Sequence, residues 1–393
     1  PKTKEKDRYG YEKTIRYQEE KLNYWGYTKG NYFAPKAAYC KSNQPEKELK
    51  SFFSALHEAG IEYLMDFYFP VETDPQTVLE VLRFWRMEYR VDGFVLMGDG
   101  VWMELLARDA VLADVKLIGC GYDMGGIARK LGGKKRLAAC HSGFQSVMRR
   151  FLRGDEDQVN GFLYYTRENP QDHGEVHYLA NHDGFTLVDM TSYDTRHNME
   201  NGEENRDGSA YNYSWNCGVE GDTDDPEVMK LRFQMMRNAC TLLMCSRGIP
   251  MFLAGDEFGN TQFGNNNAYC QDNKISWLDW SLLEKNHELF EFFKYMIRFR
   301  KEHRILRENI GECSLGFPDI SFHSVKPWCD QYNSYDRYVG VMFAGQVPGK
   351  RPEIIYIASN SYWEELTITL PELPEYMNWS LKVNTIDSQT DLE

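Results

Sequence analysis

A unit of amphipathic helix, glycine and buried strand recurs along the first two thirds of the chain. In EKELKSFFSALHEAGIEYLMDFYF (46–69), apolar residues recur at helical spacing, Gly60 ends the helix, and a continuously apolar run follows. The same order returns at 74–97, 102–123 and 229–259. Strands that are apolar on both faces and joined by helices belong to a parallel sheet. The number of units predicts an α/β fold, and within that class a (β/α)8 barrel.

The number of strands falls short of a closed barrel. We expect strands at 61–69, 91–97, 114–120, 175–183 and 249–255, with a sixth near 159–165. A (β/α)8 barrel has eight strands, so we expect the two missing ones to precede residue 1.

The two ends of the chain differ in character from its middle. Residues 1–20 are highly charged before any apolar pattern starts, which predicts a charged lead-in without regular structure. From about residue 335, apolar and polar residues alternate in three short segments separated by turn residues, namely YVGVMFAG, EIIYIASN and EELTITLPEL. This pattern is typical of an antiparallel β-domain. We therefore expect the barrel, incomplete at its N-terminus, over 21–310 and a C-terminal β-domain over 311–393.

Charge and cysteine content exclude several classes of partner. The formal net charge of -14 argues against nucleic acid and against an anionic membrane, since both require clustered Lys and Arg. No stretch approaches the roughly 20 apolar residues of a membrane span. The nine cysteines form no C-x-x-C pair and have no His at zinc spacing. We therefore expect reduced thiols in a cytoplasmic protein, with no metal and no cofactor.

Three long segments carry a family resemblance. These segments resemble the bacterial glycogen debranching enzymes and plant-type isoamylases of glycoside hydrolase family 13, in the α-amylase superfamily. The three segments are HYLANHDGFTLVDMTSYDTRHNMENGEENRDGSAYNYSWNCGVEG (177–221), GIPMFLAGDEFGNTQFGNNNAYCQDNKISWLDW (248–280) and NYWGYTKGNYFAP (23–35). The resemblance implies a (β/α)8 catalytic domain, a C-terminal antiparallel β-sandwich, and action on the α-1,6 branch points of α-glucans. It also implies an N-terminal β-domain and two further barrel strands, which agrees with the number of strands found.

The two main catalytic positions of that family hold sulfur-bearing side chains in this sequence. Retaining hydrolysis needs a carboxylate nucleophile and a carboxylic acid about 5 Å apart. The family pattern V-D-G-F-R-F-D reads VDGFVLM, so the resemblance puts Met97 at the nucleophile position and Val95 at that of its orienting Arg. The pattern L-I-A-E-P-W-D reads LIGCGYD, which puts Cys120 at the acid/base position. Asp183 and His182 in NHDGFTL match the family's transition-state stabiliser and a sugar-binding His.

These replacements predict a catalytically silent site. A methionine supplies no anion, and a thiol with a pKa of about 8.5 is a poor substitute for a tuned carboxylic acid. Pro70-Val71 stands where the family has an Asn-His pair after the third strand. Losing half of a nucleophile/acid pair costs many orders of magnitude in rate.

Three residues near these positions have alternative interpretations. Asp99 is either a displaced nucleophile or a surface turn residue, and Asp123 is either a displaced acid or a neighbour of the acid position. Cys120 is either a reactive thiol or a small inert residue. We favour the surface and inert interpretations, because a loop carboxylate beyond Gly98 lies away from the strand end and nothing nearby in sequence depresses the pKa of Cys120.

Candidate sugar contacts lie in three segments. Asp183 and His182 either bind vicinal hydroxyls or keep a hydrogen-bonded barrel rim. The other candidates are Asp256, Glu257, Asn265, Asn266, Asn267, Gln271, Tyr24 and Trp25, with Tyr27 beside them. Amides suit neutral polyols but are also common in loops, and aromatic rings stack on glucose but also fill cores.

Three functions stay open on the sequence alone. In the first, the protein is a silent homologue that binds α-glucan (glycogen, amylopectin or branched dextrin) and supports an active paralogue, as a homo-oligomer or in a complex. In the second, it is an active debranching hydrolase with repositioned carboxylates such as Asp99 and Asp183. In the third, it is a structural or regulatory subunit without affinity for sugar.

Overall fold

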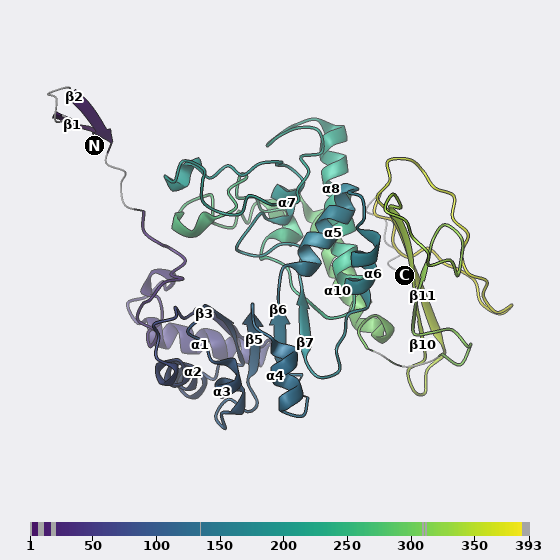
Figure 1. Cartoon of the computed structure of the whole chain (residues 1–393), viewed down its shortest axis with the longest axis horizontal. Coiled ribbons are helices and arrows are strands. Elements are labelled where there is room, and N and C mark those ends of the chain that lie inside the picture. The colour runs from purple at the N-terminus through teal and green to yellow at the C-terminus, as the bar shows by residue number, and fades with distance from the viewer. Residues whose placement is uncertain are drawn as a thin grey trace.

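A six-stranded parallel sheet organises the larger part of the molecule. The computed structural model describes residues 2–6, 12–16, 21–133, 135–308, 310 and 313–386. The strands, in chain order and sheet order alike, are β3 (Leu64–Tyr68), β4 (Gly93–Met97), β5 (Lys116–Cys120), β6 (Leu137–Cys140), β7 (Gly174–His177) and β8 (Ile249–Pro250). All neighbouring pairs are parallel. This is the order of a (β/α)8 barrel, and among the described residues the sheet does not close (Figure 1).

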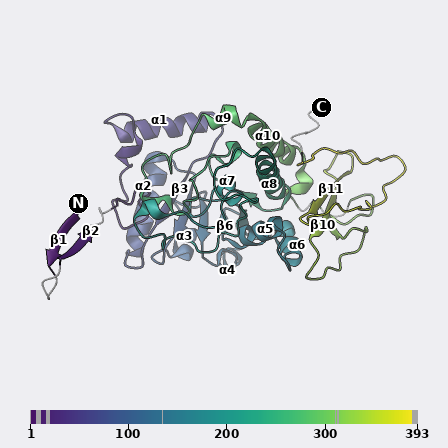
Figure 2. The same ribbon diagram turned by 90° about the horizontal axis from the view of Figure 1, so that it is seen from above.

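Helices connect the strands and cover the sheet, as Figure 2 shows from above. They are α1 (Pro45–Glu58), α2 (Pro75–Tyr89), α3 (Met103–Arg108), α4 (Met124–Lys130), α5 (Gly143–Arg153), α6 (Val159–Arg167), α7 (Leu187–Met190), α8 (Pro226–Cys245), α9 (Leu282–Lys285) and α10 (His287–Glu302). Local signals set their ends: Asp74 caps α2 by accepting from the Thr77 N–H at 3.0 Å, and Arg90 ends it at φ 58. None of the helices in the described ranges is long and apolar enough to cross a membrane.

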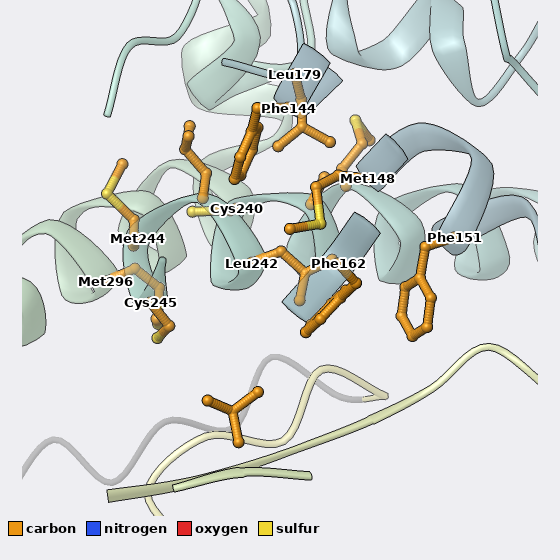
Figure 3. Packing of buried hydrophobic residues seen from close by; sticks show 14 of the residues in the cluster. Phe144, Met148, Phe151, Phe162, Leu179, Cys240, Leu242, Met244, Cys245 and Met296 are labelled. Atoms are coloured by element: carbon orange, nitrogen blue, oxygen red, sulfur yellow. The ribbon is translucent and has the colours of Figure 1, made fainter. Parts of the chain in front are cut away.

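Two hydrophobic cores support this arrangement. The first packs α2, α3 and α4 against β3, β4 and β5, around the fully buried Trp85, Phe69 and Phe94. The second lies among α5, α6, α8 and α10, where Phe144 and Met148 are fully buried (Figure 3). Each core forms because one apolar stripe of every helix faces the sheet or another helix.

A smaller antiparallel sheet follows the barrel helices. Its strands are β9 (Ile320–His323), β10 (Tyr338–Gly345) and β11 (Glu353–Asn360), with β10 in the centre. Val339, Val341 and Phe343 of β10 belong to the second core. Arg337 also donates from Nε to the carbonyl oxygen of Gly154 at 2.6 Å. The C-terminal sheet is therefore packed onto the barrel helices through a shared core.

The predicted strand near 159–165 is wrong, because this segment forms α6. Its buried residues Val159, Phe162 and Thr166 recur at helical spacing. The strand that the prediction missed is β6, whose sequence LAAC has no β-branched residue. All four of its residues are buried between β5 and β7, so tertiary packing sets this strand more than propensity does.

The chain ends also differ from expectation. Strands β1 (Lys2–Lys6) and β2 (Glu12–Arg16) pair antiparallel, so the prediction of a lead-in without regular structure is wrong at these residues. The predicted strand at 364–373 is absent, because its side chains are mostly exposed and its alternation faces no core. Strands β7 and β8 are shorter than predicted, since the chain after each one turns into irregular loops.

Candidate active site

The carboxyl ends of β4, β5 and β6 meet at one edge of the sheet. Leu96 of β4 pairs with Gly119 of β5, so the next residues, Met97 and Cys120, end neighbouring strands. Cys120 in turn pairs with Cys140, the last residue of β6. Ligands of parallel α/β sheets bind at this edge. The two altered catalytic positions therefore lie side by side where a substrate would bind.

Cys120 and Cys140 are register partners at the ends of β5 and β6, and their thiols affect each other's ionisation. The neighbouring thiol of Cys140 lowers the pKa of Cys120, whereas the thiol of Cys120 together with burial raises the pKa of Cys140. Both thiols pack against Val176 and Tyr178 on the inner face of the sheet. Cys120 is only partly buried, so the interpretation of it as a reactive thiol gains support that the sequence did not offer.

Asp66 is a carboxylate that the sequence analysis missed. It lies in β3, pairs with Val95, and accepts a hydrogen bond at Oδ2 from the Tyr27 hydroxyl at 3.2 Å. Although the side chain is open to solvent, the atoms packed around it raise its pKa by desolvation, while His182 and Tyr27 act in the opposite direction. The signal that could have found it is the lone acidic residue in the apolar run YLMDFYF.

An aromatic wall, formed by Trp25, Tyr27 and His182, stands beside this carboxylate. The rings of Tyr27 and His182 stack with centroids 5.1 Å apart and 20° between planes. Trp25 meets His182 edge-on at 5.3 Å. The backbone N–H groups of Tyr24 and Trp25 both donate to the carbonyl oxygen of Tyr269, at 2.7 and 3.1 Å. These bonds fix the segment around Tyr24 and Trp25 next to the loop that contains Tyr269. In this arrangement the rings of Trp25 and Tyr27 both contact His182.

Asp183 lies exposed in the loop after β7. The pKa of Tyr178 is raised by burial first, and then by Cys140, Cys120 and Asp183. Asp183 and the two thiols therefore each lie within electrostatic range of Tyr178. Cys120 and His182 both act electrostatically on Asp66 or are affected by it, so these positions lie in one region of the structure.

The two alternative carboxylates, Asp99 and Asp123, occupy structural positions. Gly98 has φ +91, and a Cβ on it would lie 2.3 Å from the carbonyl oxygen of Phe69. The exposed Asp99 follows in this tight turn. Asp123 is the N-cap of α4 and accepts at Oδ1 from the Gly126 N–H at 2.8 Å. These placements agree with the interpretation of both as turn and cap residues.

Asp256 and Glu257 both accept hydrogen bonds from backbone N–H groups, with Asp256 buried and Glu257 partly exposed. Asp256 is 2% exposed and accepts from the N–H groups of Leu187 and Leu253, at 2.8 and 3.2 Å. Burial raises the pKa of Asp256 to about 7. Glu257 accepts from the Gly255 N–H at 2.8 Å. Their predicted contact with sugar finds no support in this placement, because the carboxylates fix the loop after β8.

The amides between 265 and 271 form a buried amide network. Its members are Asn198, Asn201, Asn265, Asn266, Asn267 and Gln271. Asn266 is fully buried and accepts from Asn198 Nδ2 at 2.8 Å. Asn265 and Gln271 both donate to Oδ1 of Asn201, at 2.9 and 2.8 Å. Because the buried amides of Asn265, Asn266 and Gln271 are satisfied by partners in the interior, they stabilise the loop and are not presented to a ligand, whereas Asn267 is partly exposed at the edge.

Two kinds of curated protein are similar in sequence to this chain, although no family model matches it. The glycogen operon protein GlgX homologue of Mycobacterium tuberculosis is 30% identical over 462 residues, which cover 94% of this chain and 64% of that protein. The chloroplastic isoamylase 3 of Oryza sativa is 30% identical over 453 residues, which cover 95% of this chain and 56% of that protein. The chain therefore spans less than two thirds of the length of these relatives.

Solved pullulanases share the fold. The enzyme from Paenibacillus barengoltzii, in complex with maltohexaose and alpha-cyclodextrin, gives a TM-score of 0.63 at 19% identity, covering 90% of this chain and 60% of that one. The pullulanase of Anoxybacillus sp. LM18-11 gives 0.58 at 16% identity, covering 86% and 58%. At such identities the likeness concerns the fold, a (β/α)8 barrel followed by a β-sandwich. Taken with the sequence relatives, it means that the chain belongs to the glycogen debranching enzyme and isoamylase type of glycoside hydrolase family 13.

Proposed function

We propose that this chain binds α-glucan at the carboxyl edge of its parallel sheet without hydrolysing it. The observation that carries the proposal is the pair of sulfur side chains, Met97 and Cys120, at the ends of neighbouring strands. The names of the relatives support α-glucan as the ligand, since they refer to glycogen and to isoamylase. A pullulanase of similar fold was solved with maltohexaose.

Neither sulfur side chain can perform the step of the carboxylate that it replaces. The retaining mechanism needs an anion that attacks the sugar carbon and an acid that protonates the leaving oxygen. Met97 supplies no negative charge and no proton. Val95, which stands at the position of the family's Arg, is the register partner of Asp66 in the neighbouring strand. Asp66 therefore has no positively charged partner from that position. Desolvation raises the pKa of Asp66, and Val95 supplies no charge that would lower it.

The aromatic wall supplies a surface for binding. Ring faces stack on the C–H faces of glucose, and polar groups of His182 and Asp183 suit its hydroxyls. The rings of Trp25 and Tyr27 are partly exposed and Asp183 is exposed, so a sugar can reach all of them. Binding therefore does not require the groups that the strand ends have lost.

Isothermal titration calorimetry with maltohexaose and with a branched dextrin tests the binding. We expect saturable binding by the wild-type protein and a loss of about tenfold in affinity for Trp25→Ala, since one stacked ring contributes about 1 kcal/mol or more. Trp363→Ala is the control, because this ring is 75% exposed on the C-terminal domain. No binding by the wild type, or an equal loss in both variants, would instead favour a structural or regulatory subunit.

A second candidate is an active hydrolase with repositioned carboxylates. The observation that favours it is the position of Asp66 beside Tyr27 and His182 with a raised pKa, since a raised pKa favours the protonated form that a general acid needs. Asp183 would be its ionised partner. Linear maltooligosaccharides released from amylopectin, with a release that Asp66→Asn abolishes, would support this candidate over the first.

In the binding role, we propose that the chain presents glucan to an active paralogue, as a homo-oligomer or in a complex in the cytoplasm. Its nine free thiols suit a reducing compartment. Size-exclusion chromatography with and without glycogen tests the assembly, with co-elution of an active debranching enzyme as the supporting result and a constant monomer as the contradicting one.

A further inference from the structure

A second group of titratable side chains lies on the face of the sheet opposite to the thiol pair. Val176 of β7 packs with Cys140 on the inner face. Since side chains alternate along a strand, its neighbour Glu175 points to the outer face, toward the covering helices. His141, directly after β6, and Glu168, directly after α6, join Glu175 there.

His141, Glu168 and Glu175 form a donor cluster. One donor atom from each residue lies within 4.8 Å of the others. Nε2 of His141 is 3.4 Å from Oε2 of Glu175. Two ligands that bind a tetrahedral ion at about 2.0–2.1 Å stand about 3.3–3.4 Å apart. The separation of these two atoms is therefore that of two ligands of one ion.

The carboxylates of the donor cluster are buried. The side chain of Glu175 is 8% exposed and that of Glu168 is 11% exposed. Oε2 of Glu175 accepts no hydrogen bond from any residue that the structure describes. A buried carboxylate oxygen without a hydrogen bond is costly. A cation between this oxygen and Nε2 of His141 would offset the free-energy cost of burying the oxygen.

We propose that His141, Glu168 and Glu175 bind a divalent transition-metal ion such as Zn²⁺. One imidazole nitrogen and two carboxylate oxygens are ligand types that zinc accepts, and two carboxylates balance the charge of a divalent ion. The side chain of His141 is 41% exposed, which leaves an entry path from solvent and room for a water as a fourth ligand. This site is separate from the glucan site and does not depend on the proposed function.

Neighbouring side chains fix the ligands in place. His173 faces Oε1 of Glu175 with Nε2 at 2.8 Å and Oδ1 of Asp172 with Nδ1 at 2.7 Å. The Tyr164 hydroxyl donates to Oε1 of Glu168 at 2.7 Å. These bonds occupy one oxygen of each carboxylate, and such outer contacts are what orients metal ligands in proteins.

Besides the pair of Nε2 of His141 and Oε2 of Glu175 at 3.4 Å, which the ion would replace, two existing contacts compete with the ion. The Gly143 N–H donates to Nδ1 of His141 at 3.2 Å, so coordination through Nε2 moves the ring proton to Nδ1 and opens this bond. Nε2 of His177 is 3.4 Å from Oε2 of Glu168. Both contacts are at the long end of hydrogen-bond distances, so their loss is a small cost.

Titration of the metal-stripped full chain with ZnCl₂ by isothermal calorimetry tests the site. We expect one ion per chain and a thermal unfolding midpoint that rises with zinc concentration. Glu175→Gln keeps the shape of the side chain and removes its charge, so the affinity should fall at least tenfold. His141→Gln should have the same effect through loss of the imidazole ligand.

His197→Gln is the matched control. His197 faces Oε1 of Glu220 at 3.1 Å, a similar His–carboxylate pair, but it belongs to no cluster of three donors within the described ranges. Its zinc affinity should equal that of the wild type. If Glu175→Gln fails to fold by circular dichroism, the half-exposed His141→Gln decides the question. No stoichiometric zinc binding, or equal binding by the wild type and His141→Gln, overturns the proposal.

Discussion

The hydroxyl of Tyr27 donates a hydrogen bond to Oδ2 of Asp66 at 3.2 Å. This bond joins a segment near the start of the chain to the first strand of the parallel sheet. The ring of the same tyrosine stacks on His182, which comes from the loop after β7. One side chain thus connects three distant segments at the carboxyl edge of the sheet, and it makes Asp66 part of the candidate site.

Removing the Tyr27 hydroxyl should raise the pKa of Asp66 further. The bond stabilises the ionised carboxylate against the desolvation that raises its pKa. The test is an NMR titration of the Asp66 carboxyl carbon in Tyr27→Phe. Trp25→Phe is the control, because it leaves the hydroxyl in place and should leave the titration unchanged. An Asp66 pKa that does not move in Tyr27→Phe would show that the hydrogen bond contributes nothing.

Restoring only the two lost carboxylates should not restore full hydrolysis. In Met97→Asp combined with Cys120→Glu, Val95 still faces Asp66 without a cation, and Pro70-Val71 still replaces a polar pair. Adding Val95→Arg should raise the rate of this double variant by about tenfold or more, since preorganised charge is a large term in catalysis. A reducing-end assay on amylopectin measures both. Full turnover by the double variant alone contradicts this explanation of the site.

Asn266→Ala should destabilise the fold and leave glucan affinity intact. The amide of Asn266 bonds Asn198 and Asn212 in the interior, so its removal leaves buried partners unsatisfied at a cost of at least about 2 kcal/mol. Urea unfolding measures the cost, and calorimetry with maltohexaose measures the affinity. Asn267→Ala, at the partly buried edge of the amide network, should cost less. Lost affinity without lost stability would mean that Asn266 contacts the sugar.

The buried carboxyl of Asp256 should make the protein less stable as the pH rises. Burial raises its pKa to about 7 in the folded chain, against about 3.9 in an unfolded one. Between these values the unfolded chain releases the proton and the folded chain keeps it. The Asp256 contribution to the free energy of unfolding therefore falls from pH 4 to pH 7, by about 4 kcal/mol at most.

Asp256→Asn provides the comparison, because its side chain does not titrate. The stability of the wild type relative to this variant should decrease as the pH rises through that window. Urea unfolding of both proteins at several pH values measures the difference. A constant difference at every pH would contradict the raised pKa of Asp256.

The helix–glycine–strand pattern predicted most of the sheet, because β3, β4 and β5 are apolar runs that follow recognisable helix ends. It failed at β6, where LAAC carries no strand signal and only its neighbours in the sheet define it. It also failed at α6, where a sixth strand was expected although the buried positions have helical spacing. Contacts that are distant in sequence define β6, whereas the spacing of the buried residues of α6 is a local signal that the prediction overlooked.

The sequence placed Met97 and Cys120 at strand ends, because each closes a recognisable apolar run, and the structure has them there. Asp66 was hidden inside an apolar run, and its contact with Tyr27 spans 39 positions. The amides of 265–271 could not be assigned from sequence either, because the partner of Asn265 is Asn201, 64 positions away. Whether an amide faces a ligand or another amide depends on such distant partners.

The central claim is that this member of a debranching family holds α-glucan without cleaving it. The most direct measurement is the release of reducing ends from amylopectin by the wild-type protein at high concentration, with Asp66→Asn and Asp183→Asn measured beside it. We predict no release above the buffer rate for any of the three proteins, in samples that bind maltohexaose by calorimetry. Release by the wild type that either substitution abolishes would contradict the claim and establish a working hydrolase.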